Sequence, residues 1–148
     1  NKNYKGEKFE SIKIVDSISG GALFLPREIF TKLKGLNENL FWMEDIDFCI
    51  RLREKGYKVY YSSSIKIIHF RGKSSEKNYR VAISNQLISK IKFFRIHHSK
   101  ISVKIILVCI LFVSTIKSFL IFFASPFSTS YRKKMFAYLY TIRSIFNS

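Results

Sequence analysis

Residues 34–61 read KGLNENLFWMEDIDFCIRLREKGYKVYY, and this stretch decides the expected fold of the first half of the chain. Acidic residues gather near its centre and basic residues follow them, an order that matches the dipole of a helix over Glu44–Lys55. Gly56 comes next and signals the end of the helix. Ile46, Cys49 and Ile50 lie at positions i, i+3 and i+4, which gives the helix one apolar face to pack against a sheet. Val59–Tyr61 is rich in residues that favour strands. The stretch therefore predicts a helix followed by a strand.

The residues on either side of this stretch predict more strands and one more helix. Ser11–Ser17 mixes apolar and polar residues in near alternation, as a strand does, and runs into a turn at Gly20-Gly21. Ala22–Leu25 and Ile65–Phe70 are short apolar runs that predict two further strands. Pro26–Gly35 has a proline and a glutamate near its start and a glycine at its end, which predicts a short helix. Strands and helices that alternate in this way predict an α/β fold.

The second half of the chain differs from the first in charge and in hydropathy. The formal net charge is +16, yet no Asp or Glu lies after Glu76, so the second half is purely cationic. Apolar residues at helical spacing, with basic residues between them, predict a basic amphipathic helix over Tyr79–His98. The apolar segment Ile101–Phe127 follows, and Pro126 separates it from a basic, aromatic stretch over Tyr131–Phe146.

A cationic half of this kind fits an anionic partner, which is either nucleic acid or the negatively charged cytoplasmic leaflet of a membrane. Residues 101–127 are too apolar for a surface that follows phosphates, and they are about long enough to cross a hydrocarbon core. We therefore expect residues 77–148 to form a basic helical region at the cytoplasmic face of the cell membrane, with no nucleic-acid partner. Lys117 and the basic flanks leave three arrangements open: a spanning helix, an in-plane helix or re-entrant hairpin, and a soluble helical hairpin.

The two cysteines do not suggest a covalent framework. Cys49 falls in the first predicted long helix and Cys109 in the apolar segment. Their positions predict neither a disulfide nor a metal cluster, which agrees with an active site in the cytosol.

Three segments of the first half follow one another in a recognisable order. They are GGALFLPREIF at 20–30, the stretch 34–61, and IKIIHFRGKS at 65–74. This order resembles the C-terminal half of the catalytic domain in glycosyltransferase family 2, the inverting GT-A-type enzymes, especially the rhamnosyltransferase-like and galactofuranosyltransferase-like members. The resemblance implies that residues 1–76 are the acceptor-side half of a GT-A-type domain.

The resemblance also assigns the chemistry of the site. Glu44 and Asp45 match the family's acidic pair, whose second member removes the proton from the acceptor hydroxyl, so Asp45 takes the place of the catalytic base. His69 matches a strand-end histidine that helps to hold a divalent cation, Mg or Mn, on the donor diphosphate of metal-dependent members. A single displacement needs such a base beside the attacking hydroxyl and positive charge beside the departing diphosphate. The start of a helix stabilises a carboxylate anion by up to about 1 kcal/mol.

The acceptor side of the site is assigned in the same way. Gly21 and Ala22 take the place of the family's Gly-Ala, and Trp42 would stack its ring on the acceptor sugar. Purely structural interpretations stay open for each feature. Acids at a helix start match its dipole, the glycines make a tight turn, and Trp42 acts as a hydrophobic staple. His69 would then be an ordinary sheet-edge histidine.

The function implied by the resemblance belongs to a longer protein. The family's nucleotide-binding half, with its Asp-x-Asp motif, should precede Asn1, so we expect the chain to be inactive without it. In the full enzyme it would help to move a sugar from a nucleotide-sugar donor to a surface glycan, most naturally a lipid-linked one. The alternatives are a catalytically inactive membrane-bound remnant that serves as a scaffold, and a basic nucleic-acid-binding protein.

Overall fold

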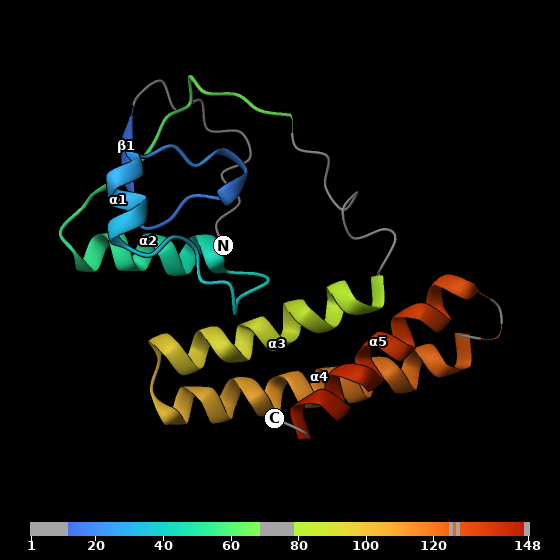
Figure 1. Ribbon diagram of the computed structural model, residues 1–148. Helices are drawn as coiled ribbons and strands as arrows, with labels where there is room; N and C mark the ends of the chain where they lie inside the picture. The colour runs from blue at the N-terminus through green and yellow to red at the C-terminus, as the bar shows by residue number, and fades with distance from the viewer. Residues whose placement is uncertain (1–11, 69–78, 125, 127, 147–148) are drawn as a thin grey trace. The chain divides into compact units, whose positions relative to one another are not determined.

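The computed structural model describes residues 12–68, 79–124, 126 and 128–146, which are mostly helical with one small sheet (Figure 1). The chain divides into two compact units. Unit 1 comprises Asn1–Asn37 and Glu44–Phe70, and unit 2 comprises Glu38–Met43 and Arg71–Ser148. The two units are described separately below.

The sheet of unit 1 has two antiparallel strands among the described residues. Strand β1 (Lys13–Val15) pairs with β2 (Val59–Tyr61), so that Lys13 lies opposite Tyr61 and Val15 opposite Val59. Both strands were predicted from the sequence, and both are confirmed. The α/β prediction is thus confirmed only as a small sheet with helices beside it, and the GT-A-type sheet stays a prediction.

The helices of unit 1 begin and end where the sequence places their signals. Helix α1 (Arg27–Lys32) starts directly after Pro26, and α2 (Glu44–Glu54) starts with its three acidic residues. At the end of α2 the backbone N–H of Gly56 donates to the carbonyl of Arg53 at 2.9 Å, and that of Tyr57 donates to the carbonyl of Leu52 at 3.1 Å. Gly56 has a φ of +81°, a value that glycine adopts without steric cost, so its position defines the end of α2.

Two predicted strands are absent from the described part of the chain. Ala22–Leu25 contains the end of a 3-10 turn, η1 (Gly20–Ala22), followed by irregular backbone, and Phe24 is 76% exposed. Residues 65–68 of the predicted strand Ile65–Phe70 are also irregular, whereas His69 and Phe70 lie outside the described residues. Strand-like composition is insufficient here, because a strand also needs a neighbour whose N–H and C=O groups complete its hydrogen bonds.

The core of unit 1 is built mainly by one face of α2. Its buried members are Leu33, Phe48, Cys49, Leu52 and Val59. Phe48 and Cys49 are fully buried, and the ring of Phe30 packs against that of Phe48 at 5.6 Å between centroids. Of the predicted apolar stripe Ile46, Cys49 and Ile50, only Cys49 belongs to this core, and the other two are partly buried. Phe48 and Leu52 take their place, because the face of α2 that meets α1 and β2 is rotated from the predicted one.

Unit 2 is a group of three long helices. They are α3 (Tyr79–His97), α4 (Lys100–Ala124) and α5 (Thr129–Phe146). Helix α4 packs along α5, and α3 packs on both (Figure 1). The hydroxyl of Ser99 accepts the N–H of Ser102 at 3.3 Å, which caps the start of α4. The predicted order of a basic helix, an apolar segment and a basic aromatic segment is confirmed, and each segment is a helix.

The interior of unit 2 combines large apolar side chains, among them Ile91, Phe93 and Ile110, with small and hydroxyl-bearing ones. The fully or nearly fully buried ones include Ser84, Ser114, Ser118, Ala137 and Thr141. Thr141 donates from its hydroxyl to the carbonyl of Ala137 at 2.8 Å, and the hydroxyl of Ser84 donates to the same carbonyl at 3.0 Å. The hydroxyls of Ser114 and Ser118 are buried with no hydrogen-bond partner among the described residues.

Two substitutions on the interior of unit 2 are expected to change stability in opposite directions. Ser114→Ala removes a buried hydroxyl without a partner and should raise the free energy of unfolding by about 1 kcal/mol. Thr141→Val keeps the shape but removes hydrogen bonds, and should lower it by about 1–2 kcal/mol. Denaturant unfolding of the two variants beside the unaltered protein measures both effects. Destabilisation by Ser114→Ala would mean that this hydroxyl has a partner after all.

Candidate functional site

The site is centred on Asp45 in the first turn of α2. One carboxylate oxygen, Oδ2, accepts the backbone N–H of Gly20 at 2.9 Å, across a sequence separation of 25 residues. The other, Oδ1, accepts the N–H of Ile46 at 2.8 Å. A carboxylate oxygen can accept more than one hydrogen bond, so each keeps capacity for an incoming hydroxyl. Asp45 is only partly buried, which leaves it open to a ligand.

The turn that approaches Asp45 carries two of the predicted acceptor residues. Gly21 and Ala22 follow Gly20 within η1, and the site therefore unites them with the acidic pair. A Cβ added to Gly20 would lie 3.5 Å from the Cβ of Asp45, an ordinary van der Waals distance. The turn and the first turn of α2 are thus in direct contact, as two parts of one site would be.

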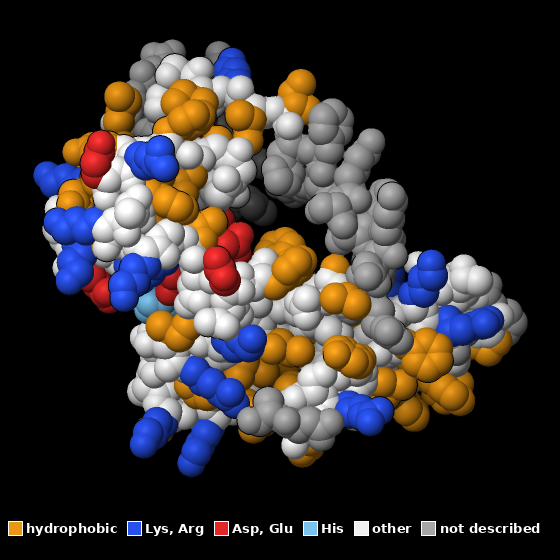
Figure 2. Space-filling model, in the orientation of Figure 1, with side chains coloured by type: hydrophobic (Ala, Val, Ile, Leu, Met, Phe, Trp, Pro, Cys, Tyr) orange, Lys and Arg blue, Asp and Glu red, His pale blue; other side chains and the backbone are white. Residues whose placement is uncertain are grey.

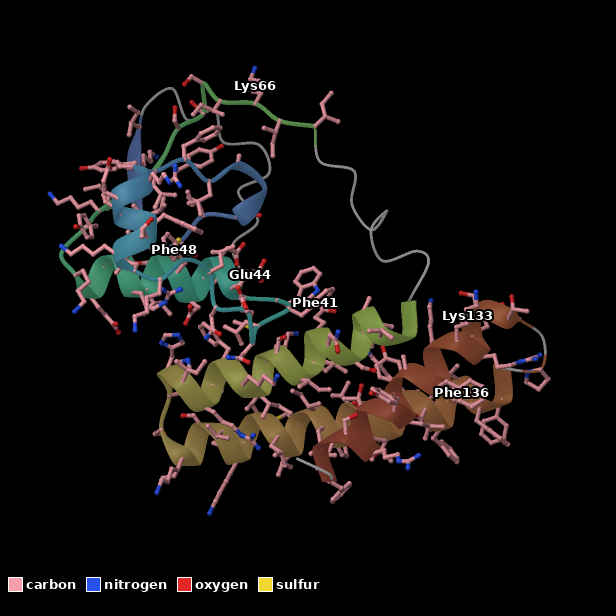
Figure 3. The ribbon with its side chains drawn as sticks, in the orientation of Figure 1. Phe41, Glu44, Phe48, Lys66, Lys133 and Phe136 are labelled. Carbon is pink, nitrogen blue, oxygen red and sulfur yellow. The ribbon has the colours of Figure 1, made fainter. Side chains whose placement is uncertain are left out.

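The residues just before Asp45 also have an unusual backbone. Glu44 occupies the first position of α2, where it is partly buried (Figure 3). Met43 precedes it with a φ of +72°, a left-handed conformation that is uncommon for a residue other than glycine. Strain of this kind concentrates at functional sites. It is a feature that the sequence does not reveal, because methionine is not a residue type that signals a positive φ.

The predicted aromatic contact, Trp42, belongs to unit 2, where its loop is attached to α3. The hydroxyl of Ser89 accepts the backbone N–H groups of Phe41 at 2.9 Å and of Trp42 at 3.4 Å. The Nζ atom of Lys92 donates to the carbonyl of Asn39 at 3.3 Å. Phe41 and Trp42 are 55% and 49% exposed, so their rings are accessible to a ligand. The sequence did not predict a role for Ser89, because a serine within an amphipathic helix does not indicate such a contact.

Asp47 and Arg51, which also lie on α2, have a structural role. The guanidinium of Arg51 pairs with the carboxylate of the buried Asp47 at 2.8 Å. It also donates to the carbonyls of Leu33 at 2.6 Å and Gly35 at 2.8 Å, beyond the last turn of α1. One side chain of α2 thereby satisfies carbonyls at the end of α1. This network holds α2, and with it Asp45, against the rest of unit 1.

Cys49 lies close to this site but is not a nucleophile. Burial raises the pKa of its thiol, and this effect outweighs the lowering by a backbone hydrogen bond with Ile18. The thiol therefore stays protonated at neutral pH, and only a thiolate would react as a nucleophile. Both cysteines are free, as the sequence predicts.

The predicted metal ligand cannot be placed. His69 lies outside the described residues, so its convergence with Asp45 stays a prediction. Elsewhere in the described part of the chain, no group of three or more His, Cys, Asp or Glu side chains is arranged to hold a metal ion. The described residues therefore do not by themselves form a cation site.

Comparison with known proteins supports the broader assignment of unit 1. Residues 5–73, just under half of the chain, match the model of a protein family described as the N-terminal domain of galactosyltransferase. No curated protein and no solved structure matches the chain. The match supports a glycosyltransferase-like domain over these residues, and it does not distinguish family 2 from other glycosyltransferases.

Proposed function

We propose, starting from this glycosyltransferase-like domain, that the chain is the acceptor-side part of an inverting glycosyltransferase. Its donor would be a nucleotide sugar bound mainly by another part of the full-length enzyme, and its acceptor a surface glycan carried on a lipid. The observation that carries the proposal is the hydrogen bond between Asp45 and Gly20. It joins the second acid of the pair to the turn that contains Gly21 and Ala22.

The proposed reaction is a single displacement. Asp45 accepts the proton of an acceptor hydroxyl, and the hydroxyl oxygen forms a bond to the anomeric carbon of the donor sugar. The bond from that carbon to the nucleoside diphosphate breaks, and the diphosphate leaves with the electron pair. Attack opposite the leaving group inverts the anomeric configuration. The backbone N–H of Gly20 holds the carboxylate in one orientation for this step, which is the kind of positioning on which general-base catalysis depends.

The proposal includes a divalent cation only as one held by His69 and the diphosphate of the donor. The described residues supply no set of ligands for it. No step assigned to Asp45 depends on the cation.

A lipid-linked acceptor fits the way in which the aromatic loop is held. The loop Glu38–Met43 is hydrogen-bonded to α3, the helix that packs directly on the apolar helix α4.

The test of this function is a transfer assay on the full-length protein in membranes. A panel of labelled nucleotide sugars is supplied, and label is followed into the lipid fraction together with released nucleoside diphosphate. We expect transfer from one donor, with an inverted anomeric configuration in the product by NMR. A product with retained configuration, or no acceptor-dependent consumption of any donor, would contradict the proposal.

Trp42 is expected to contribute to acceptor binding in this assay. Trp42→Ala should raise the KM for the acceptor about fivefold with kcat nearly unchanged, because ring stacking contributes about 1 kcal/mol. Trp42→Phe should restore most of the affinity. Phe24→Ala, at another exposed aromatic, is the matched control and should leave KM unchanged. An unaltered KM in Trp42→Ala would assign the ring to packing alone.

A further inference from the structure

Helix α4 presents one continuous apolar stripe to the outside of unit 2. The stripe consists of Ile101, Ile105, Val108, Phe112, Phe119 and Phe123, each between 59% and 71% exposed. Their spacing of three, four or seven residues places all six on one face, from the first turn of α4 to the last. Only 17% of the most apolar part of this helix is buried. Figure 2 shows hydrophobic side chains at the surface of the helices, with Lys and Arg among them.

Of the three lysines of α4, Lys100 and Lys104 lie in its first two turns, and Lys117, in the apolar part, does not interrupt the stripe. Lys117 lies five residues after Phe112 and two before Phe119, a spacing that puts it on a different face of the helix. Its Nζ atom lies 5.4 Å from the centre of the Tyr138 ring on α5, a cation–π contact. The charge of Lys117 is therefore directed toward α5 and away from the stripe. Lys104, three residues after Ile101 and four before Val108, borders the stripe near its start, and from Val108 to Phe123 the stripe is free of charge.

The interior of unit 2 contains small and hydroxyl-bearing side chains, Ser84, Ser114, Ala137 and Thr141, beside the larger Ile91, Phe93 and Ile110. All four phenylalanines of α4 are exposed. In water the large apolar side chains would be the ones buried. Small and hydroxyl side chains between helices, with large apolar ones outside, are typical of helices that pack within lipid. The occupant that matches both features is the hydrocarbon of a bilayer.

We propose that the stripe lies within one leaflet of an anionic membrane, with α4 parallel to its surface, so that α3–α5 form an in-plane anchor. The 25 residues of α4 are about 37 Å long and by themselves could cross a core of about 30 Å. Helix α5, which packs along α4, could not cross such a core. Between Lys134 and Arg143 of α5 only eight residues, about 12 Å, carry no charge.

A spanning arrangement of α4 would draw the basic residues of its neighbours into the hydrocarbon. In the in-plane arrangement they can all reach the headgroups, while the stripe enters the acyl chains by about 5–10 Å. Anionic headgroups complement α3–α5, because no acidic residue follows Glu76. This proposal does not depend on the proposed sugar transfer.

The first test measures binding of the full-length protein to vesicles by flotation. The unaltered protein should bind vesicles with 30% anionic lipid at least tenfold more strongly than neutral vesicles. Phe112→Asp combined with Phe119→Asp should lower binding at least tenfold, whereas Phe24→Asp, an equally drastic change in unit 1, should not. Equal binding of the double variant and the control would overturn the proposal. So would a loss of self-association in the double variant without any vesicle binding by the unaltered protein, because the stripe would then contact a second copy.

The second test separates an in-plane helix from a spanning one. Lys100→Cys at the first residue of α4 and Ser130→Cys at the start of α5 mark the two ends of α4, and each is placed in a Cys109→Ala background, with the buried Cys49 retained. A membrane-impermeant thiol reagent is applied to sealed vesicles of one orientation. Labelling of both positions from the cytoplasmic side supports the in-plane anchor. Labelling from opposite sides would overturn it.

Discussion

Asp45→Asn is expected to reduce the kcat of the full-length enzyme by about 100- to 10,000-fold, the range that general-base catalysis contributes. Asparagine has nearly the same shape, and its carbonyl oxygen can still accept the N–H of Gly20. The N–H of Ile46 loses its acceptor, a small loss because the N–H groups of a first helical turn have no partner within the helix. It cannot accept a proton from the acceptor hydroxyl at neutral pH. Donor binding and the unfolding midpoint should therefore stay close to those of the unaltered enzyme. Steady-state transfer kinetics, donor titration and thermal unfolding measure the three quantities.

The control for this experiment is Glu28→Gln, which removes an exposed acid from the first turn of α1. It should leave kcat within about twofold, because single surface charges contribute little. A kcat for Asp45→Asn that equals that of the control would remove Asp45 from the mechanism. A loss of folding in Asp45→Asn would instead give the carboxylate a structural role at η1.

Arg51→Met is expected to lower the free energy of unfolding by about 3 kcal/mol, the largest effect on stability that we predict. The substitution removes the guanidinium that pairs with the buried carboxylate of Asp47. It also removes the donors to the carbonyls of Leu33 and Gly35, which lie beyond the last turn of α1. Methionine preserves much of the apolar stem, so the loss reports on the charge and its hydrogen bonds.

Arg53→Met on the same helix provides a matched comparison. Arg53 pairs with Asp16 at 2.7 Å, but the Asp16 side chain is 90% exposed. Solvent screens such a pair, and its loss should cost at most about 0.5 kcal/mol. Urea unfolding of the two variants should therefore separate them by more than 2 kcal/mol. Equal losses would mean that the buried network around Asp47 adds no stability.

The same pair of variants tests whether Arg51 has a part in the chemistry. If it only positions α2, Arg51→Met should lower transfer in proportion to the folded fraction and leave the acceptor KM of the folded enzyme unchanged. A folded Arg51→Met enzyme with a raised donor KM would instead place the guanidinium beside the diphosphate.

The sequence by itself determined the local structure of this protein. The ends of α1 and α2 and the three helical segments of unit 2 follow from proline, glycine, charge order and apolar spacing, because a helix closes its hydrogen bonds within a few residues. Strands β1 and β2 were also predicted, but their pairing was not. Ala22–Leu25 and Ile65–Ile68 looked equally strand-like, and only a neighbouring strand could have made them so.

Tertiary structure decided the contacts that give these elements a site and a surface. The chain order suggested that Asp45 and the glycine turn belong together, but the hydrogen bond to Gly20 exists only because α2 packs on the core of unit 1. The attachment of Trp42 to Ser89 and the contact of Lys117 with the ring of Tyr138 likewise join residues on different elements. The physical reason is the same in each case. Helix geometry fixes which side chains share a face, whereas the neighbour that each face meets depends on packing across the whole unit.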